Sequence, residues 1–179
     1  CYSLIDGPRQ AGGGGSFVIA VRRDGASADR SVSSWLVDEA CVGDPIVLYP
    51  PTGQFVLHEG DGPVLLIGGG IGMTPILSLF KALADRDHAA QVELVQVARG
   101  PDELIFSDEL TAALARLSCG GVLRHVTRHH GGGAVADDLD APLTGRPALR
   151  AVMADIAPET QVYFCGPAGM IAEAEAAHR

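Results

Sequence analysis

The segment LLIGGGIGMTP, residues 65–75, joins a continuous apolar run to a glycine-rich turn and then to a Thr-Pro pair. An apolar run of this kind is typical of a strand that is covered on both faces. The glycines permit a ligand to approach the backbone closely, while Thr74 and Pro75 suit the start of a helix, with Thr74 as its N-cap. The segment therefore predicts a strand, a turn and a helix whose amino-terminal end faces a phosphate or pyrophosphate.

Beyond residue 63 the sequence repeats this unit of strand and helix. Apolar runs that favour buried strands alternate with segments that have apolar residues at helical spacing. The predicted strands are 63–68, 91–98, 121–127 and 161–165, and the predicted helices are 76–86, 107–117, 147–156 and 167–178. Such alternation is typical of an α/β doubly wound parallel sheet, in which ligands bind at the carboxyl ends of the strands.

The first 60 residues have a different pattern. The runs YSLI, SFVIAVRR and DPIVLYP are rich in β-branched and aromatic residues and are separated by Gly, Pro and Asp clusters. Short runs spaced in this way favour an antiparallel sheet or barrel. We therefore expect two domains, a β-barrel domain in residues 1–60 and a nucleotide-binding α/β domain in residues 61–179.

Composition argues against several classes of function. The net charge is −9 and only 13 Lys and Arg are spread along the chain, which disfavours binding to a nucleic-acid backbone. No apolar run approaches the roughly 20 residues of a transmembrane helix. The four cysteines form no CxxC pair, so neither a metal site nor a disulfide framework is indicated. We expect a cytoplasmic protein with no nucleic-acid partner, metal or membrane segment.

Motifs along nearly the whole chain resemble those of the ferredoxin–NADP reductase superfamily. They are, in order, CYSL (1–4), SVSSWL (31–36), PPTGQF (50–55), GGGIGMTP (68–75) and FCGPAGM (164–170). Members of that superfamily carry a flavin on a β-barrel and a nicotinamide nucleotide on the parallel-sheet domain that follows. The resemblance implies an antiparallel barrel that is incomplete at its N-terminus, because further strands and the Arg of the family's Arg-x-Tyr-Ser motif would precede CYSL.

The resemblance also implies which residues bind the flavin. Tyr2 would lie against the isoalloxazine ring, and Ser3, followed by Leu4, would hydrogen-bond near flavin N5 and help to pass a proton. Ser33 and Trp35 match a turn that binds the flavin phosphate. FAD is the expected prosthetic group, with FMN as the alternative.

Two motifs imply the residues that bind the nicotinamide nucleotide, the pyrophosphate turn and the Cys-Gly-Pro-x-x-Met element. The residues that match them are Gly69, Gly70, Gly72, Thr74, Pro75, Cys165, Gly166, Pro167 and Met170. Cys165 would act with Ser3 at the site of hydride transfer, by packing against the nicotinamide rather than as a nucleophile.

Three residues that follow the second and third predicted strands bear on the choice of nucleotide. Thr127 and Arg128 match the Ser-Arg pair with which NADP-selective members of the superfamily bind the 2′-phosphate, and Arg99 is a further basic candidate. Because a guanidinium suits bidentate binding of phosphate, NADPH is favoured over NADH.

The expected function is that of a flavoprotein oxidoreductase, which passes a hydride from NAD(P)H to FAD and then electrons to a separate acceptor. An oxygenase, an iron–sulfur protein and a haem domain all fit as the acceptor. One alternative is a nucleotide-binding regulatory module without turnover. Another is a flavin-free Rossmann dehydrogenase, although this requires an acidic residue roughly 20 residues past the glycines, where Asp85 and Asp87 come too early.

Overall fold

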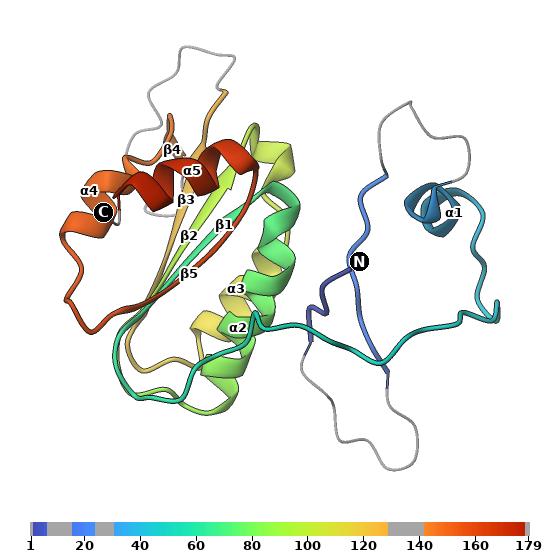
Figure 1. The fold of residues 1–179 in the computed structure, drawn as a ribbon, viewed down its shortest axis with the longest axis horizontal. Coiled ribbons are helices and arrows are strands. Elements are labelled where there is room, and N and C mark those ends of the chain that lie inside the picture. The colour runs from blue at the N-terminus through green and yellow to red at the C-terminus, as the bar shows by residue number, and fades with distance from the viewer. Residues whose placement is uncertain (1, 7–15, 24–30, 129–141, 178–179) are drawn as a thin grey trace.

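A computed structural model describes residues 2–6, 16–23, 31–128 and 142–177 of the chain, so that Cys1 of the CYSL motif lies outside the described residues. Its centre is a five-stranded parallel sheet with the strand order β4-β3-β2-β1-β5 (Figure 1). The strands are β1 (Val64–Gly69), β2 (Val92–Ala98), β3 (Gly120–Val126), β4 (Leu143–Thr144) and β5 (Gln161–Cys165).

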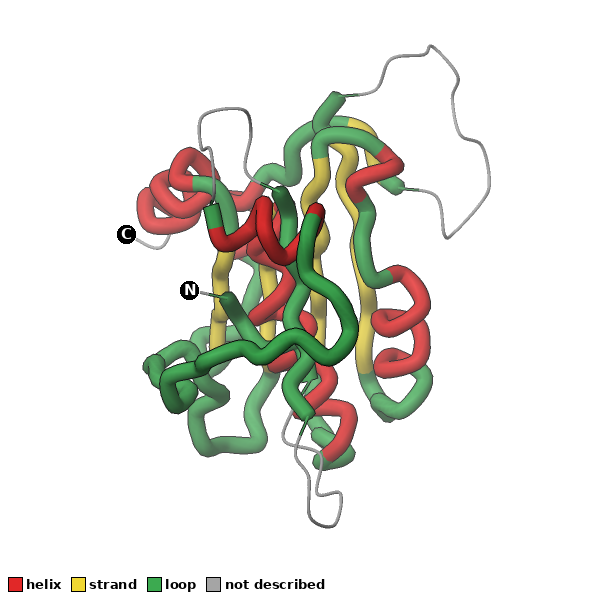
Figure 2. The backbone as a smooth tube through the Cα atoms, turned by 90° about the vertical axis from the view of Figure 1, so that its right-hand side faces the viewer, coloured by secondary structure: helices red, strands yellow, loops and turns green. Residues whose placement is uncertain are grey.

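Helices cover both faces of this sheet, as the views in Figures 1 and 2 show. One face carries α2 (Met73–Asp85) and α3 (Ser107–Leu114), and the other carries α4 (Leu149–Ala154) and α5 (Ala168–Ala177). The predicted α/β doubly wound sheet is therefore confirmed. Within the described ranges, no helix has the length and apolar character needed to span a bilayer.

The two cores follow from the alternation of side chains along β1. Val64 and Leu66 pack with Phe80 and other residues of α2, whereas Leu65 and Ile67 pack on the opposite face with residues of α4 and α5. Because both faces are covered, all six residues of the strand are buried, which is why the sequence there is a continuous apolar run.

The predicted strands and helices of the α/β part are all present, with ends that differ by a few residues, and the structure adds β4. This strand has only two residues, both exposed, and it pairs with the end of β3. A strand so short and so exposed has neither the apolar run nor the alternation that identifies strands in a sequence.

The N-terminal part does not confirm the predicted barrel. Its described residues contain one helix, α1 (Val32–Asp38), and one antiparallel bridge between Leu4 and Ile19, while the run DPIVLYP forms no strand. Val47 and Tyr49 of that run are 94% and 93% exposed. An antiparallel ladder needs a partner strand at hydrogen-bonding distance, and the described chain provides none beside this run.

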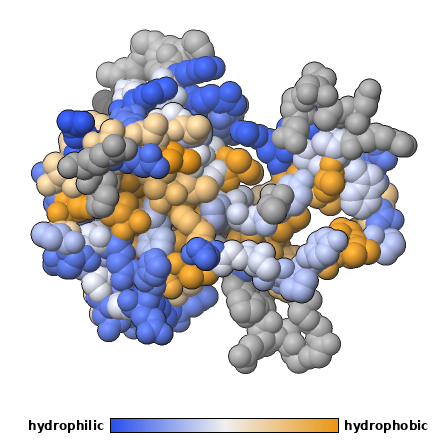
Figure 3. Space-filling model, viewed as in Figure 1, coloured by the Kyte–Doolittle hydropathy of each residue, from blue (hydrophilic) through white to orange (hydrophobic). Residues whose placement is uncertain are grey.

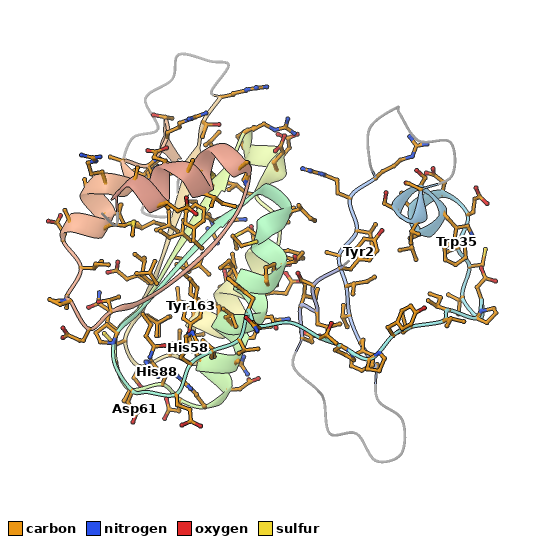
Figure 4. The ribbon with its side chains drawn as sticks, viewed as in Figure 1. Tyr2, Trp35, His58, Asp61, His88 and Tyr163 are labelled. Carbon is orange, nitrogen blue, oxygen red and sulfur yellow. The ribbon has the colours of Figure 1, made fainter. Side chains whose placement is uncertain are left out.

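The connection between the two parts is held near the amino end of the sheet (Figure 4). The His58 backbone N–H donates to the Tyr163 hydroxyl oxygen at 2.7 Å, and that hydroxyl donates to Gln161 Oε1 at 3.0 Å. Next along the chain, the Gly62 carbonyl lies 2.9 Å from Nε2 of His88, which is buried after the end of α2. These contacts fix the connection immediately before it enters β1.

Candidate functional site

The glycine turn, residues 68–72, joins β1 to α2 and includes the 3₁₀ turn η1 (Gly70–Gly72). Gly70 has a φ of +55°, in the left-handed region that favours glycine. At Gly72, a Cβ would overlap the Cys165 carbonyl and would lie 2.9 Å from the Gly166 nitrogen. Gly72 therefore permits the turn to pack directly on the chain that follows β5.

The start of α2 differs from the prediction that Thr74 is the N-cap. The N-cap is Gly72, because η1 runs directly into the helix, and Thr74 and Pro75 are the second and third helical residues. The Thr74 hydroxyl instead donates to the Ile71 carbonyl at 3.0 Å and holds the turn. No side chain caps the amino end of α2, which suits the binding of an anionic ligand there.

A cleft of about 380 Å³ lies beside the turn, within the roughly 300–1,000 Å³ of small-molecule sites. Three segments that are far apart in the sequence line it: the N-terminal chain, the glycine turn with the start of α2, and the chain between β5 and α5. The lining residues are Tyr2, Ser3, Ala20, Arg22, Gly69, Gly70, Ile71, Gly72, Thr74, Pro75, Cys165, Gly166 and Pro167. The structure thus brings most of the predicted site residues together.

Tyr2 and Ser3 form the N-terminal side of the cleft, with Tyr2 on the segment labelled in Figure 4. The Tyr2 side chain is 39% exposed, so that part of its ring is available to a ligand. Leu4 does not line the cleft; it pairs with Ile19 and thereby supports the segment. Tyr2 and Ser3 therefore line the same cleft as the glycine turn.

Cys165 lies at the carboxyl end of β5, paired in register with Gly68 of β1. Burial raises the pKa of its thiol. A protonated thiol is a poor nucleophile, so the environment favours a packing role for Cys165. Met170 lies behind the turn rather than in the cleft lining, with its sulfur 2.7 Å from the position that a Cβ on Gly69 would take.

Arg22 is a lining residue that the sequence analysis missed. Its Nη1 atom lies 4.0 Å from the position that a Cβ on Gly70 would take, which places a cation over the glycine turn. The sequence contains no signal that separates Arg22 from its neighbour Arg23, because the run SFVIAVRR predicts only a strand and the position of Arg22 over the turn depends on how the two parts pack.

Arg99, Thr127 and Arg128 gather at the carboxyl ends of β2 and β3, outside the lining of the cleft. The Thr127 and Arg128 amides donate to the Ala98 and Arg99 carbonyls at 2.9 and 2.8 Å. The Arg99 side chain pairs with Glu103 at the end of η2 (Pro101–Glu103), with Nη2–Oε1 at 2.9 Å and Nε–Oε2 at 3.1 Å. This pairing raises the pKa of Arg99 and lowers that of Glu103.

Ser33 and Trp35 lie on α1, and neither lines the cleft. The segment predicted as a phosphate-binding turn is the first turn of this helix, where the Ser31 hydroxyl oxygen accepts from the Ser34 amide at 3.1 Å. Ser33 is buried, with its hydroxyl 2.8 Å from that of Ser31. The Ser31 hydroxyl therefore caps α1, and the predicted phosphate ligand Ser33 lies beside this cap.

Comparison with known proteins identifies several similar chains. Residues 66–176 match the family model described as the oxidoreductase NAD-binding domain. The flavohemoprotein of Bordetella pertussis is 32% identical over 168 residues, which cover 93% of this chain and 40% of that protein. The glycine betaine monooxygenase reductase subunit of Chromohalobacter salexigens is 29% identical over 158 residues, covering 85% of this chain and 40% of the relative.

A solved structure shares the fold along almost the entire chain. The flavohem-like FAD/NAD-binding domain of nitric oxide dioxygenase from Vibrio cholerae superimposes with a TM-score of 0.75 at 26% identity, covering 98% of this chain and 70% of that structure. The chain spans only 40% of the length of the two curated relatives.

Proposed function

This chain belongs to the oxidoreductase NAD-binding domain family, and from that premise we propose that it is a flavin-dependent reductase module, passing a hydride from NAD(P)H to FAD and then electrons to a separate acceptor. The membership confirms the resemblance to the ferredoxin–NADP reductase superfamily. The observation that carries the proposal is the cleft, in which Tyr2 and Ser3 face the glycine turn and Cys165.

The residues on the α/β side of the cleft fit a nicotinamide nucleotide. The glycine backbone allows close approach and the amino end of α2 lacks a side-chain cap. From the N-terminal side of the cleft, Arg22 adds a positive charge. These groups would hold the diphosphate, because helix amino ends and guanidinium groups both favour anions. The Cys165 thiol, whose pKa is raised by burial, would pack against the nicotinamide ring without acting as a nucleophile.

The residues on the N-terminal side fit a flavin ring. Tyr2 would stack on it, and the Ser3 hydroxyl would donate a hydrogen bond and hold a proton near flavin N5. When both are bound, flavin and nicotinamide supply the hydride and electron chemistry. The chain itself would contribute the proximity of the two rings.

The remaining flavin contacts are proposed on α1, where Ser33 and Trp35 would bind the flavin phosphate as part of a flavin-binding barrel domain that includes residues 1–60. FAD is favoured over FMN. The similarity of this chain to the FAD/NAD-binding domain from Vibrio cholerae supports this choice.

The relatives support a haem or oxygenase acceptor. One is a flavohemoprotein and another is the reductase subunit of a monooxygenase. By analogy, electrons from this module would pass to a separate protein or domain that contains a haem or belongs to an oxygenase.

Reconstitution tests the proposed activity. Protein incubated with FAD and then freed of unbound flavin should keep the visible absorption of an oxidised flavin, and anaerobic addition of NADPH or NADH should bleach it. Retention of FMN alone would correct the choice of flavin. A protein that retains neither flavin would contradict the proposal and favour a nucleotide-binding module without turnover.

The proposed preference for NADPH rests on Arg99, Thr127 and Arg128, which lie at the ends of β2 and β3, where the Arg128 amide donates to the Arg99 carbonyl. Arg128→Ala should raise the KM for NADPH about tenfold, the effect of losing one charged phosphate contact, and leave that for NADH unchanged. Arg150→Ala, at an exposed position of α4, is the matched control. Equal weakening of both nucleotides would remove the 2′-phosphate assignment.

A further inference from the structure

We propose that the ion pair between Asp6 and Lys81 is a positioning device for hydride transfer, which fixes the segment carrying Tyr2 and Ser3 along α2. The inference rests on the function proposed for the cleft. The Lys81 ammonium donates to Asp6 Oδ1. Lys81 lies on α2, whose amino end follows the glycine turn, and Asp6 lies four residues after Tyr2. The pair therefore joins the two sides of the cleft.

The Asp6–Lys81 pair is more sheltered than the other ion pairs of the described residues. The Lys81 and Asp6 side chains are 20% and 17% exposed, against 51% and 62% for Arg116 and Asp85, which also involve α2. Water and salt screen a sheltered pair less than an exposed one. The Asp6–Lys81 contact can therefore hold a defined geometry where a surface pair would not.

A second anchor lies next to Asp6 and acts differently. The Ile5 side chain is 7% exposed and packs in the core cluster that includes the apolar residues of α2, while its amide donates to the Val18 carbonyl at 3.0 Å. Apolar packing is non-directional, so it holds the segment against the helix without fixing its position along the axis. The charged hydrogen bond from Lys81 is directional and supplies that constraint.

The short distance along the chain makes this constraint effective at the cleft. From Tyr2 to Asp6 the backbone spans at most about 14 Å, even when fully extended. From Thr74 in the cleft lining to Lys81, α2 rises about 10 Å. The span from Tyr2 to Asp6 is thus comparable to the span from Thr74 to Lys81. Because so little chain separates Asp6 from the cleft, a displacement of Asp6 would also displace Tyr2 and Ser3. Misplacement of reacting groups by about 1 Å can cost about 100-fold in rate.

Lys81→Met tests the inference, because methionine keeps an apolar stem and removes the charge. In protein loaded with FAD, the single-turnover rate of flavin reduction at saturating NAD(P)H should fall at least about tenfold, with the nucleotide KM unchanged. The charge-exchanged protein, with Asp6→Lys and Lys81→Asp together, should recover most of the lost rate. Asp85 lies on the same helix as Lys81 and pairs with Arg116. Asp85→Asn removes that pair and should leave the rate unchanged.

A second measurement uses flavin-free protein. The Ile5 amide should exchange its hydrogen about tenfold faster in Lys81→Met than in the native protein, and at the native rate in Asp85→Asn. If native protein accepts no hydride, the proposed function fails and this inference with it. If native protein is reduced, an unchanged reduction rate or an unchanged Ile5 exchange in Lys81→Met overturns this inference alone.

Discussion

The two parts of the chain contain similar apolar residues, but these are mostly buried in the α/β part and mostly exposed in the N-terminal part. In the α/β part, Leu66 and Ile67 are completely buried, whereas Val47 and Tyr49 in the N-terminal part are almost fully exposed. Apolar surface is visible over the N-terminal part at the right of Figure 3. Helices cover β1 on both faces, α2 on one side and α4 and α5 on the other, whereas the run at 44–50 has no partner strand among the described residues. Burial is therefore complete along β1 and absent along this run.

The largest expected effect tests this contrast directly. Leu66→Ala should lower the free energy of unfolding by about 2–5 kcal/mol, because it opens a cavity in a fully packed core. Val47→Ala should change it by less than about 0.5 kcal/mol, since that side chain has little to lose. Urea titration measures both. A large loss in Val47→Ala would show that the N-terminal part packs in solution, and the contrast would be broken.

A smaller effect concerns whether binding, like burial, is concentrated in the α/β part. Gly70→Val places a β-branched residue at a φ of +55°, at a cost of about 1–2 kcal/mol, and puts its side chain into the cleft. The nucleotide KM should rise at least about tenfold while flavin is retained. Gly121→Val is the matched control, because its Cβ would meet open space on β3 without a positive φ. Unchanged kinetics in Gly70→Val would contradict the role of the turn.

The smallest effect measures what the N-terminal part contributes to the nucleotide. Arg22→Gln should raise the KM for NADPH and NADH alike, by about fivefold, because it removes an exposed charge that would face the shared diphosphate. Arg23→Gln removes the neighbouring charge, which pairs with Asp38 instead, and should leave both KM values unchanged. If the two variants behave alike, the cleft draws its affinity from the α/β part alone.

Much of the α/β part could be predicted because the pattern of apolar residues within a segment reports how many of its faces are buried. The apolar run at 63–68 indicates a strand covered on both faces and the spacing at 76–86 indicates a helix with one buried face, and the structure confirms both elements. The predicted strand at DPIVLYP had equally good residue types, but strand propensity says nothing about where a partner lies. Similarly, the segment SVSSWL contains Ser31, which caps α1, but the motif alone did not predict a helix there.

The site residues that belong to a recognised motif could be predicted from the sequence. The motifs CYSL, GGGIGMTP and FCGPAGM converge on one cleft. Arg22 belongs to no quoted motif, and its place over the glycine turn depends on how the two parts pack. The Asp6–Lys81 pair is beyond the reach of sequence patterns for the same reason, because its partners lie 75 residues apart.

The contacts of His58 with Tyr163 and of Gly62 with His88 fix the connecting chain at a point away from the cleft. The placement of the two parts and the chemistry of the cleft therefore depend on different residues. They hold the connecting chain at one end of the sheet, while the glycine turn and Cys165 lie at the other. An insertion or deletion between residues 57 and 62 would reset the angle between the two parts without replacing any residue that lines the cleft. The connecting chain is thus the place where the relative placement of the two parts can be changed while the cleft lining keeps its residues.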